Sequence, residues 1–92
     1  MIVRIATEGQ YRLDDVKLAR VNELDNQLVQ LVSSQDSDGF ANTFAMLLEY
    51  IRTNGEKLAD TELVESNIIL PAPDLSASEA AEFFSGEGLF PN

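Results

Sequence analysis

The stretch VNELDNQLVQLV, residues 21–32, decides the architecture around which the rest of the chain is organised. Its apolar side chains recur three or four positions apart, which places them on one face of an α-helix. The members of this apolar face are Val21, Leu24, Leu28, Leu31 and Val32. The sequence therefore predicts an amphipathic helix that packs its apolar face against a core.

Asp25 interrupts this pattern, because the helical rotation per residue places it inside the apolar arc rather than on the polar side. A buried, unpaired carboxylate costs several kcal/mol, so this side chain needs a partner. We expect a structural ion pair with Arg4 or Arg12, whose side chains are long enough to cross a helix–sheet layer. A rim position with the carboxylate in water and a ligand site are the alternatives.

A β-hairpin is expected before this helix. Residues 2–6 are rich in strand-forming side chains, and residues 11–13 can return antiparallel to them. Glu8-Gly9 fits a two-residue turn, because glycine tolerates positive φ. Asp14-Asp15 then offers a carboxylate that can cap the helix, with a catalytic or metal-binding pair as the alternative.

A second amphipathic helix is expected after the polar stretch at residues 33–39 and should end near Asn54-Gly55. Its apolar positions are Phe40, Phe44, Leu47, Leu48 and Ile51. Two helices joined by so short a loop should pack as an antiparallel pair. The loop is not a calcium site, because Ala45 occupies the position of the bidentate acid, so we expect a loop with a helix cap.

A third strand is expected at residues 67–70, stopped by Pro71, while residues 54–61 are interpreted as a connecting loop. Strands and helices segregated in this way indicate an α+β fold. The fold would comprise an N-terminal β-hairpin, an antiparallel helix pair, a third strand in a small sheet and a short C-terminal helix. Residues 1–92 suffice for one domain and are too few for two.

The C-terminal helix is predicted from its cap. Ser76 and Glu79 have the spacing of a capping box, with Leu75 placed ahead of them as a hydrophobic staple. The helix should run from about residue 77 to residue 85, with Gly86 just after its end.

Histidine and cysteine are absent from the sequence. This removes the commonest general base, the thiol nucleophile and the usual ligands of soft metals. We therefore expect a binding protein rather than an enzyme, with no catalytic residue, no cofactor and no metal site.

The charge is strongly acidic and unevenly distributed. The net charge is −10, and residues 58–92 hold seven acids but neither lysine nor arginine. A field of this sign repels nucleic acid and anionic bilayers. The N-terminal stretch lacks the pattern of a signal peptide, and no window approaches the roughly 20 apolar residues of a membrane span. We expect a cytoplasmic protein without direct membrane insertion.

Two groups of residues are candidates for protein contact. Met46 and Tyr50 lie one helical turn apart at the edge of the second helix's apolar face, where they are either exposed together or covered by the chain's own C-terminal segment. The second group combines acids with apolar side chains and comprises Glu79, Glu82, Phe83, Glu87, Leu89 and Phe90. An acidic rim around an apolar anchor suits a weak, salt-sensitive contact. Burial of these aromatic side chains in the chain's own core is the alternative.

Several segments, taken in order, point to a known family: MIVRIATEGQYRL at residues 1–13, NELDN at 22–26, ELVES at 62–66, Leu70-Pro71 and GEGLFP at 86–91. Together they resemble PspAA, the PspA-associated protein, over essentially the full chain. The resemblance implies a single domain encoded beside PspA, the phage-shock coiled-coil protein that assembles on stressed membranes. It supplies no established catalytic or ligand residues.

The resemblance and the missing catalytic groups indicate a non-enzymatic adaptor or regulator that binds a PspA-type coiled-coil protein in the envelope stress response. Such a protein would reach the membrane periphery through PspA. An acidic decoy that binds a basic protein surface by charge mimicry is the alternative. Self-association is left open, because a chain this short gains stability by burying more surface.

Overall fold

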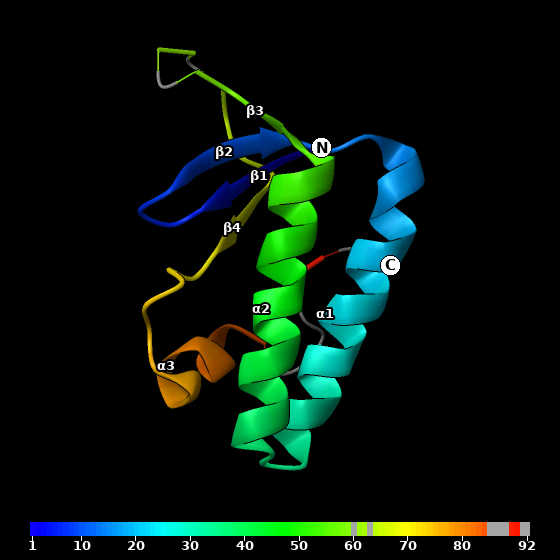
Figure 1. Ribbon diagram of the computed structural model, residues 1–92, viewed down its shortest axis with the longest axis vertical. Helices are drawn as coiled ribbons and strands as arrows, with labels where there is room; N and C mark the ends of the chain where they lie inside the picture. The colour runs from blue at the N-terminus through cyan, green and yellow to red at the C-terminus, as the bar shows by residue number, and fades with distance from the viewer. Residues whose placement is uncertain (60, 63, 85–88, 91–92) are drawn as a thin grey trace.

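The computed structural model describes residues 1–59, 61–62, 64–84 and 89–90, which form a four-stranded mixed sheet, two long helices and a short C-terminal helix (Figure 1). The α+β fold class expected from the sequence is confirmed. The elements in chain order are β1 (Ile2–Ile5), β2 (Gly9–Arg12), α1 (Leu18–Ser33), α2 (Ser37–Asn54), β3 (Glu56–Lys57), β4 (Ile68–Leu70) and α3 (Ala77–Ala81). A 3₁₀ turn precedes α1 at Asp15–Lys17, and another follows α3 at Glu82–Phe84.

β1 and β2 form the predicted hairpin, but the turn lies earlier than expected. The antiparallel register places Ile5 opposite Gly9, so residues 6–8 form the turn. Thr7 adopts a φ of 69°, and the N–H of Glu8 donates to the carbonyl of Ile5 at 2.9 Å. The predicted Glu8-Gly9 turn is therefore wrong, because the ladder takes Gly9 into β2.

The sheet has the order β3-β2-β1-β4. The expected third strand is β4, which pairs parallel to β1 with Val3 opposite Ile68, and Asn67 accepts a hydrogen bond from the N–H of Ile2 at 2.8 Å. β3 was not expected, since its two residues lie in the stretch interpreted as a loop. It pairs with β2 through Tyr11 and Lys57, and two residues are too few to show the alternation typical of a strand.

The two long helices run antiparallel as expected (Figure 1). Asp36 caps α2 by accepting a hydrogen bond from the N–H of Gly39 at 2.9 Å, as the loop composition predicted. The prediction that a carboxylate of Asp14-Asp15 caps α1 is wrong. Asp14 precedes the 3₁₀ turn and makes no side-chain capping bond there, and Lys17 rather than an acid occupies the position before α1.

Ser76 caps α3, as its spacing from Glu79 predicted. The hydroxyl of Ser76 accepts from the N–H of Glu79 at 3.3 Å and donates to its carboxylate at 2.8 Å. The helix ends at Ala81 and tightens into the 3₁₀ turn, so it is shorter than predicted. Gly86, expected after its end, lies outside the described residues.

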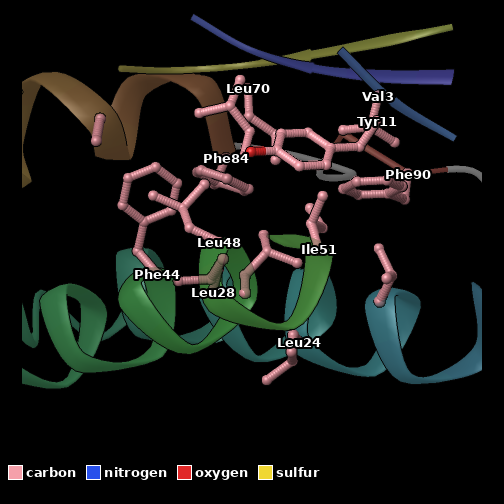
Figure 2. Packing of buried hydrophobic residues seen from close by; sticks show 14 of the residues in the cluster. Val3, Tyr11, Leu24, Leu28, Phe44, Leu48, Ile51, Leu70, Phe84 and Phe90 are labelled. Carbon is pink, nitrogen blue, oxygen red and sulfur yellow. The ribbon is translucent and has the colours of Figure 1, made fainter. Parts of the chain in front are cut away.

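The core lies between the helix pair and a second layer made of the sheet and α3 (Figure 2). The helices supply Val21, Leu24, Leu28, Phe40, Phe44, Leu47, Leu48 and Ile51, all buried. The sheet side supplies Val3, Ile5, Tyr11 and Leu70. Phe84 joins the two sides, because its ring meets the rings of Phe40 and Phe44 edge-on, with centroids 5.7 and 5.8 Å away.

Candidate protein-contact site

Asp25 is buried as the helical pattern predicted, with 0% of its surface exposed, but its partners are not arginines. Its two carboxylate oxygens accept hydrogen bonds from the backbone N–H groups of Leu89 and Phe90, each at 3.0 Å. Figure 1 shows this short segment (red) returning beside α1. Asp25 therefore fixes the C-terminal segment against the helix pair.

The predicted ion pair of Asp25 with Arg4 or Arg12 is not formed. Both arginines are exposed, while their strand neighbours Val3 and Tyr11 are buried. Successive side chains of a strand point to opposite faces, so both guanidinium groups lie on the sheet face turned away from the helices. Arg12 instead lies 3.8 Å from the carboxylate of Glu56.

The C-terminal aromatic residues divide between core and surface. Phe84 is 0% exposed and Phe90 is 3% exposed, whereas Phe83 is 46% exposed. Of the two alternatives for Phe90, an exposed anchor and a buried core residue, the second is confirmed, since its ring completes the protein's own core (Figure 2). Leu89 is partly buried against the same core. Glu87 lies outside the described residues.

Met46 and Tyr50 line a shallow hollow of about 340 Å³ on the outer side of α2, together with Arg20. Met46 is 50% exposed, but Tyr50 is partly buried and its hydroxyl lies 3.5 Å from the carbonyl of Lys17. The two side chains therefore form a smaller apolar patch than the pattern indicated. Their role in protein contact stays a prediction.

A larger apolar depression, which we call the α2–α3 groove, lies between α2 and the segment that leads into α3. Its volume is about 400 Å³. α2 contributes Phe40, Ala41, Phe44, Ala45 and Leu48, and the facing segment contributes Pro73, Leu75, Ala77 and Ala80. A second hollow of about 260 Å³ continues past the start of α3 and shares Phe40 and Ala77 with the groove.

A charged cluster closes one end of the groove. Arg52 donates to both carboxylate oxygens of Glu8, at 2.6 and 2.7 Å, and lies 3.6 Å from Glu49. The hydroxyl of Tyr11 donates to Glu8 at 2.9 Å. The hydrogen bond from Arg52, assisted by that from Tyr11, holds the pKa of Glu8 below its ordinary value of 4.5 against the opposing effect of burial. The same pair raises the pKa of Arg52.

Comparison with models of protein families gives a match to PspAA, described as PspA-Associated protein, over residues 1–92. The chain belongs to the PspAA family. The resemblance noted in the sequence is confirmed over its full length. Searches of curated proteins and of solved structures gave no match.

Two further features of this PspAA-family protein bear on the site. None of the helices in its described residues is long and apolar enough to cross a bilayer. The same part of the chain places no three acids together in a way that could hold a metal ion.

Exposed acids lie around the groove, and one of them, Glu79, is among the acids that were expected from the sequence to form a rim. Glu49 lines it, Asp74 lies between the lining residues Pro73 and Leu75, and Glu79 precedes Ala80. Glu82 is also exposed. Residues 58–92 contain no basic side chain. The charged side chains on the wall formed by residues 73–80 are therefore all acidic.

Sequence reasoning missed the groove itself. Ala41 and Ala45 are exposed one helical turn apart on α2, and they face Ala77 and Ala80 on α3. Small side chains on both walls leave the space between them open. Four alanines at helical spacing were a visible signal, but only the tertiary structure places the two sets opposite each other.

The Glu8–Arg52 pair gives this PspAA-family domain a specific dependence on pH. A carboxyl group whose pKa is lowered on folding stabilises the protein above its unfolded pKa, and that stability is lost as the pH falls through the lower folded pKa. We expect the wild type to lose about 1 kcal/mol more than Glu8→Gln between about pH 6 and about pH 3. Urea titrations across this range measure the difference. If the stability of the wild type and that of Glu8→Gln change with pH by the same amount, the Glu8–Arg52 pair does not stabilise the fold.

Proposed function

We propose that this PspAA-family protein is a non-enzymatic adaptor or regulator that binds a PspA-type coiled-coil membrane-stress protein through its α2–α3 groove. Its place would be in the cytoplasm, with access to the membrane only through PspA. The family description names an association with PspA. The observation that carries the proposal is an apolar groove with acidic residues around it, on a protein whose sequence lacks histidine and cysteine.

The dimensions of the groove favour a helix as its occupant. The lining residues of α2 run from Phe40 to Arg52, and a rise of 1.5 Å per residue makes this wall about 18 Å long. Such a length accommodates roughly three turns of a partner helix, whose apolar positions recur at the same spacing. The small side chains of Ala41 and Ala45 permit a close approach of the partner's backbone.

The charges around the groove favour a partner helix with basic flanks. Glu49, Asp74 and Glu79 are exposed, and Arg52, which also lies 3.6 Å from Glu49, is held by Glu8. Lysine or arginine beside the partner's apolar stripe would complement these acids. Complementary charges of this kind mainly raise the association rate, and their effect weakens as salt screens them.

Blocking the groove tests the proposal. Ala45→Trp places a large ring in the groove from an exposed position, so we expect the affinity for the cognate PspA to fall by about tenfold or more. Ala19→Trp is the matched control, because Ala19 is exposed on α1 and does not line the groove; its affinity should stay within about twofold of the wild type. Isothermal titration with PspA, both as protomer and as assembled polymer, measures both variants.

Two outcomes contradict the proposal. Absence of binding to either form of PspA would exclude the adaptor role. Binding that collapses with salt and is equally strong in Ala45→Trp and the wild type would favour charge mimicry by an acidic surface instead.

A further inference from the structure

The hydrogen bonds of Asp25 connect residues 64 and 65 positions apart in the sequence. Acids are rarely buried completely, and a carboxylate that accepts two successive peptide N–H groups forms stronger hydrogen bonds than a neutral acceptor would. The interaction therefore holds Leu89 and Phe90 in one position on α1. Asp25 itself does not line the groove.

The segment held by Asp25 is continuous in sequence with the wall of the groove. Ala77 and Ala80 form part of that wall, and Phe84 follows them in the 3₁₀ turn. The ring of Phe84 packs on Phe40 and Phe44, which also line the groove. Leu89 and Phe90 are the next described residues.

α3 is too short to hold its own position. It contains 5 residues, and an isolated helix of this length is unstable in water. The position of Ala77 and Ala80 therefore depends on what fixes the chain on either side. On the N-terminal side β4 pairs with β1, and on the C-terminal side Phe84 enters the core and Asp25 holds the segment beyond it.

We propose that Asp25 is a positioning residue of the α2–α3 groove, acting through Leu89 and Phe90 to fix the wall formed by α3. Seating of the C-terminal segment on Asp25 and binding of a partner helix in the groove are then thermodynamically linked. Linkage is reciprocal, so an occupied groove protects the seated segment, and a released segment weakens the groove. The linkage to partner binding rests on the proposed function, whereas the positioning role of Asp25 concerns the free protein alone.

Asp25→Asn tests the positioning role in the free protein. The asparagine side chain keeps the shape of aspartate, but it has one acceptor oxygen and turns an NH₂ group toward a backbone N–H. Measured by NMR well below the melting temperature, the amides of Leu89 and Phe90 should exchange with solvent about tenfold faster or more. In the same variant, the amide resonances of Ala77 and Ala80 should shift from their wild-type positions. Asp14→Asn makes the same chemical change at an exposed site without a capping bond, and it should leave all four amides unchanged.

Partner binding supplies a readout that a purely structural role would not affect. Saturation with PspA should slow the exchange of the Leu89 and Phe90 amides by about threefold or more in the wild type, although neither residue lines the groove. Folded Asp25→Asn should bind PspA about tenfold more weakly. If Asp25→Asn does not fold, Phe90→Leu replaces it, because this variant keeps the carboxylate and a buried apolar side chain while it weakens the packing that seats the segment.

The two proposals fail in different ways. If the wild type does not bind PspA, the proposed function fails, while the amide shifts still decide whether Asp25 positions the wall. Faster exchange of Leu89 and Phe90 with unchanged resonances for Ala77 and Ala80 would overturn the positioning role. Unchanged protection on saturation with PspA would overturn the linkage.

Discussion

Phe84→Ala is expected to lower the free energy of unfolding by about 3–5 kcal/mol, the typical cost of removing a buried phenylalanine ring. The side chain is fully buried between the helix pair and α3, and its ring contacts both Phe40 and Phe44. The two surrounding rings lie one turn apart on α2 and stack on each other, so they cannot collapse freely into the space left behind. A loss of this size is a large part of the total stability of a small domain.

Phe83→Ala is the matched control, because the same ring is removed from the adjacent position, where 46% of the residue's surface is exposed. We expect it to change stability by less than about 0.5 kcal/mol. Urea titrations followed by circular dichroism give both values. Equal losses for the two variants would show that the 3₁₀ turn does not direct Phe84 inward and Phe83 outward.

Asp25→Ala should destabilise the protein by about 2–4 kcal/mol. The substitution removes the acceptor of two backbone N–H groups in a buried setting, and each unsatisfied donor costs about 1–3 kcal/mol. The gain in helix propensity from alanine offsets only a fraction of this loss.

Gln27→Ala is the control for helix propensity, because Gln27 is exposed on the same helix. Its stability should be equal to that of the wild type or slightly higher. Denaturant titration of both variants separates the lost hydrogen bonds from the effect of alanine on the helix. A loss below about 0.5 kcal/mol for Asp25→Ala would show that the bonds to Leu89 and Phe90 contribute little to folding.

The elements with a long or chemically distinctive pattern were predictable from the sequence. The spacing of Leu24 and Leu28 predicted α1, the polar stretch at residues 33–39 predicted a capped start of α2, and Ser76 with Glu79 predicted the cap of α3. These features depend on residues within a few positions of one another, so local spacing is sufficient to identify them. β3 escaped prediction because a strand of two residues has no periodicity and forms only through its pairing with β2.

For Asp25, the sequence determined burial, and the tertiary structure decided the partner. An acid inside an apolar arc must find hydrogen-bond donors, and the periodicity alone showed that requirement. The donors proved to be backbone N–H groups, which nearly every residue carries and which therefore leave no trace in the composition. Strand alternation already placed Arg4 and Arg12 on the outer face, and this constraint excludes both as partners.

By itself, the sequence determined the helix pair, the hairpin, the acidic character and the family of this protein. Only the tertiary structure decided which C-terminal aromatic rings are buried, since Phe83 and Phe84 are chemically identical neighbours. It also created the α2–α3 groove, whose walls come from segments more than twenty residues apart. The physical reason is the same in both cases: burial and concavity are properties of the packed arrangement, and a local pattern specifies what a side chain can do but not what lies opposite it.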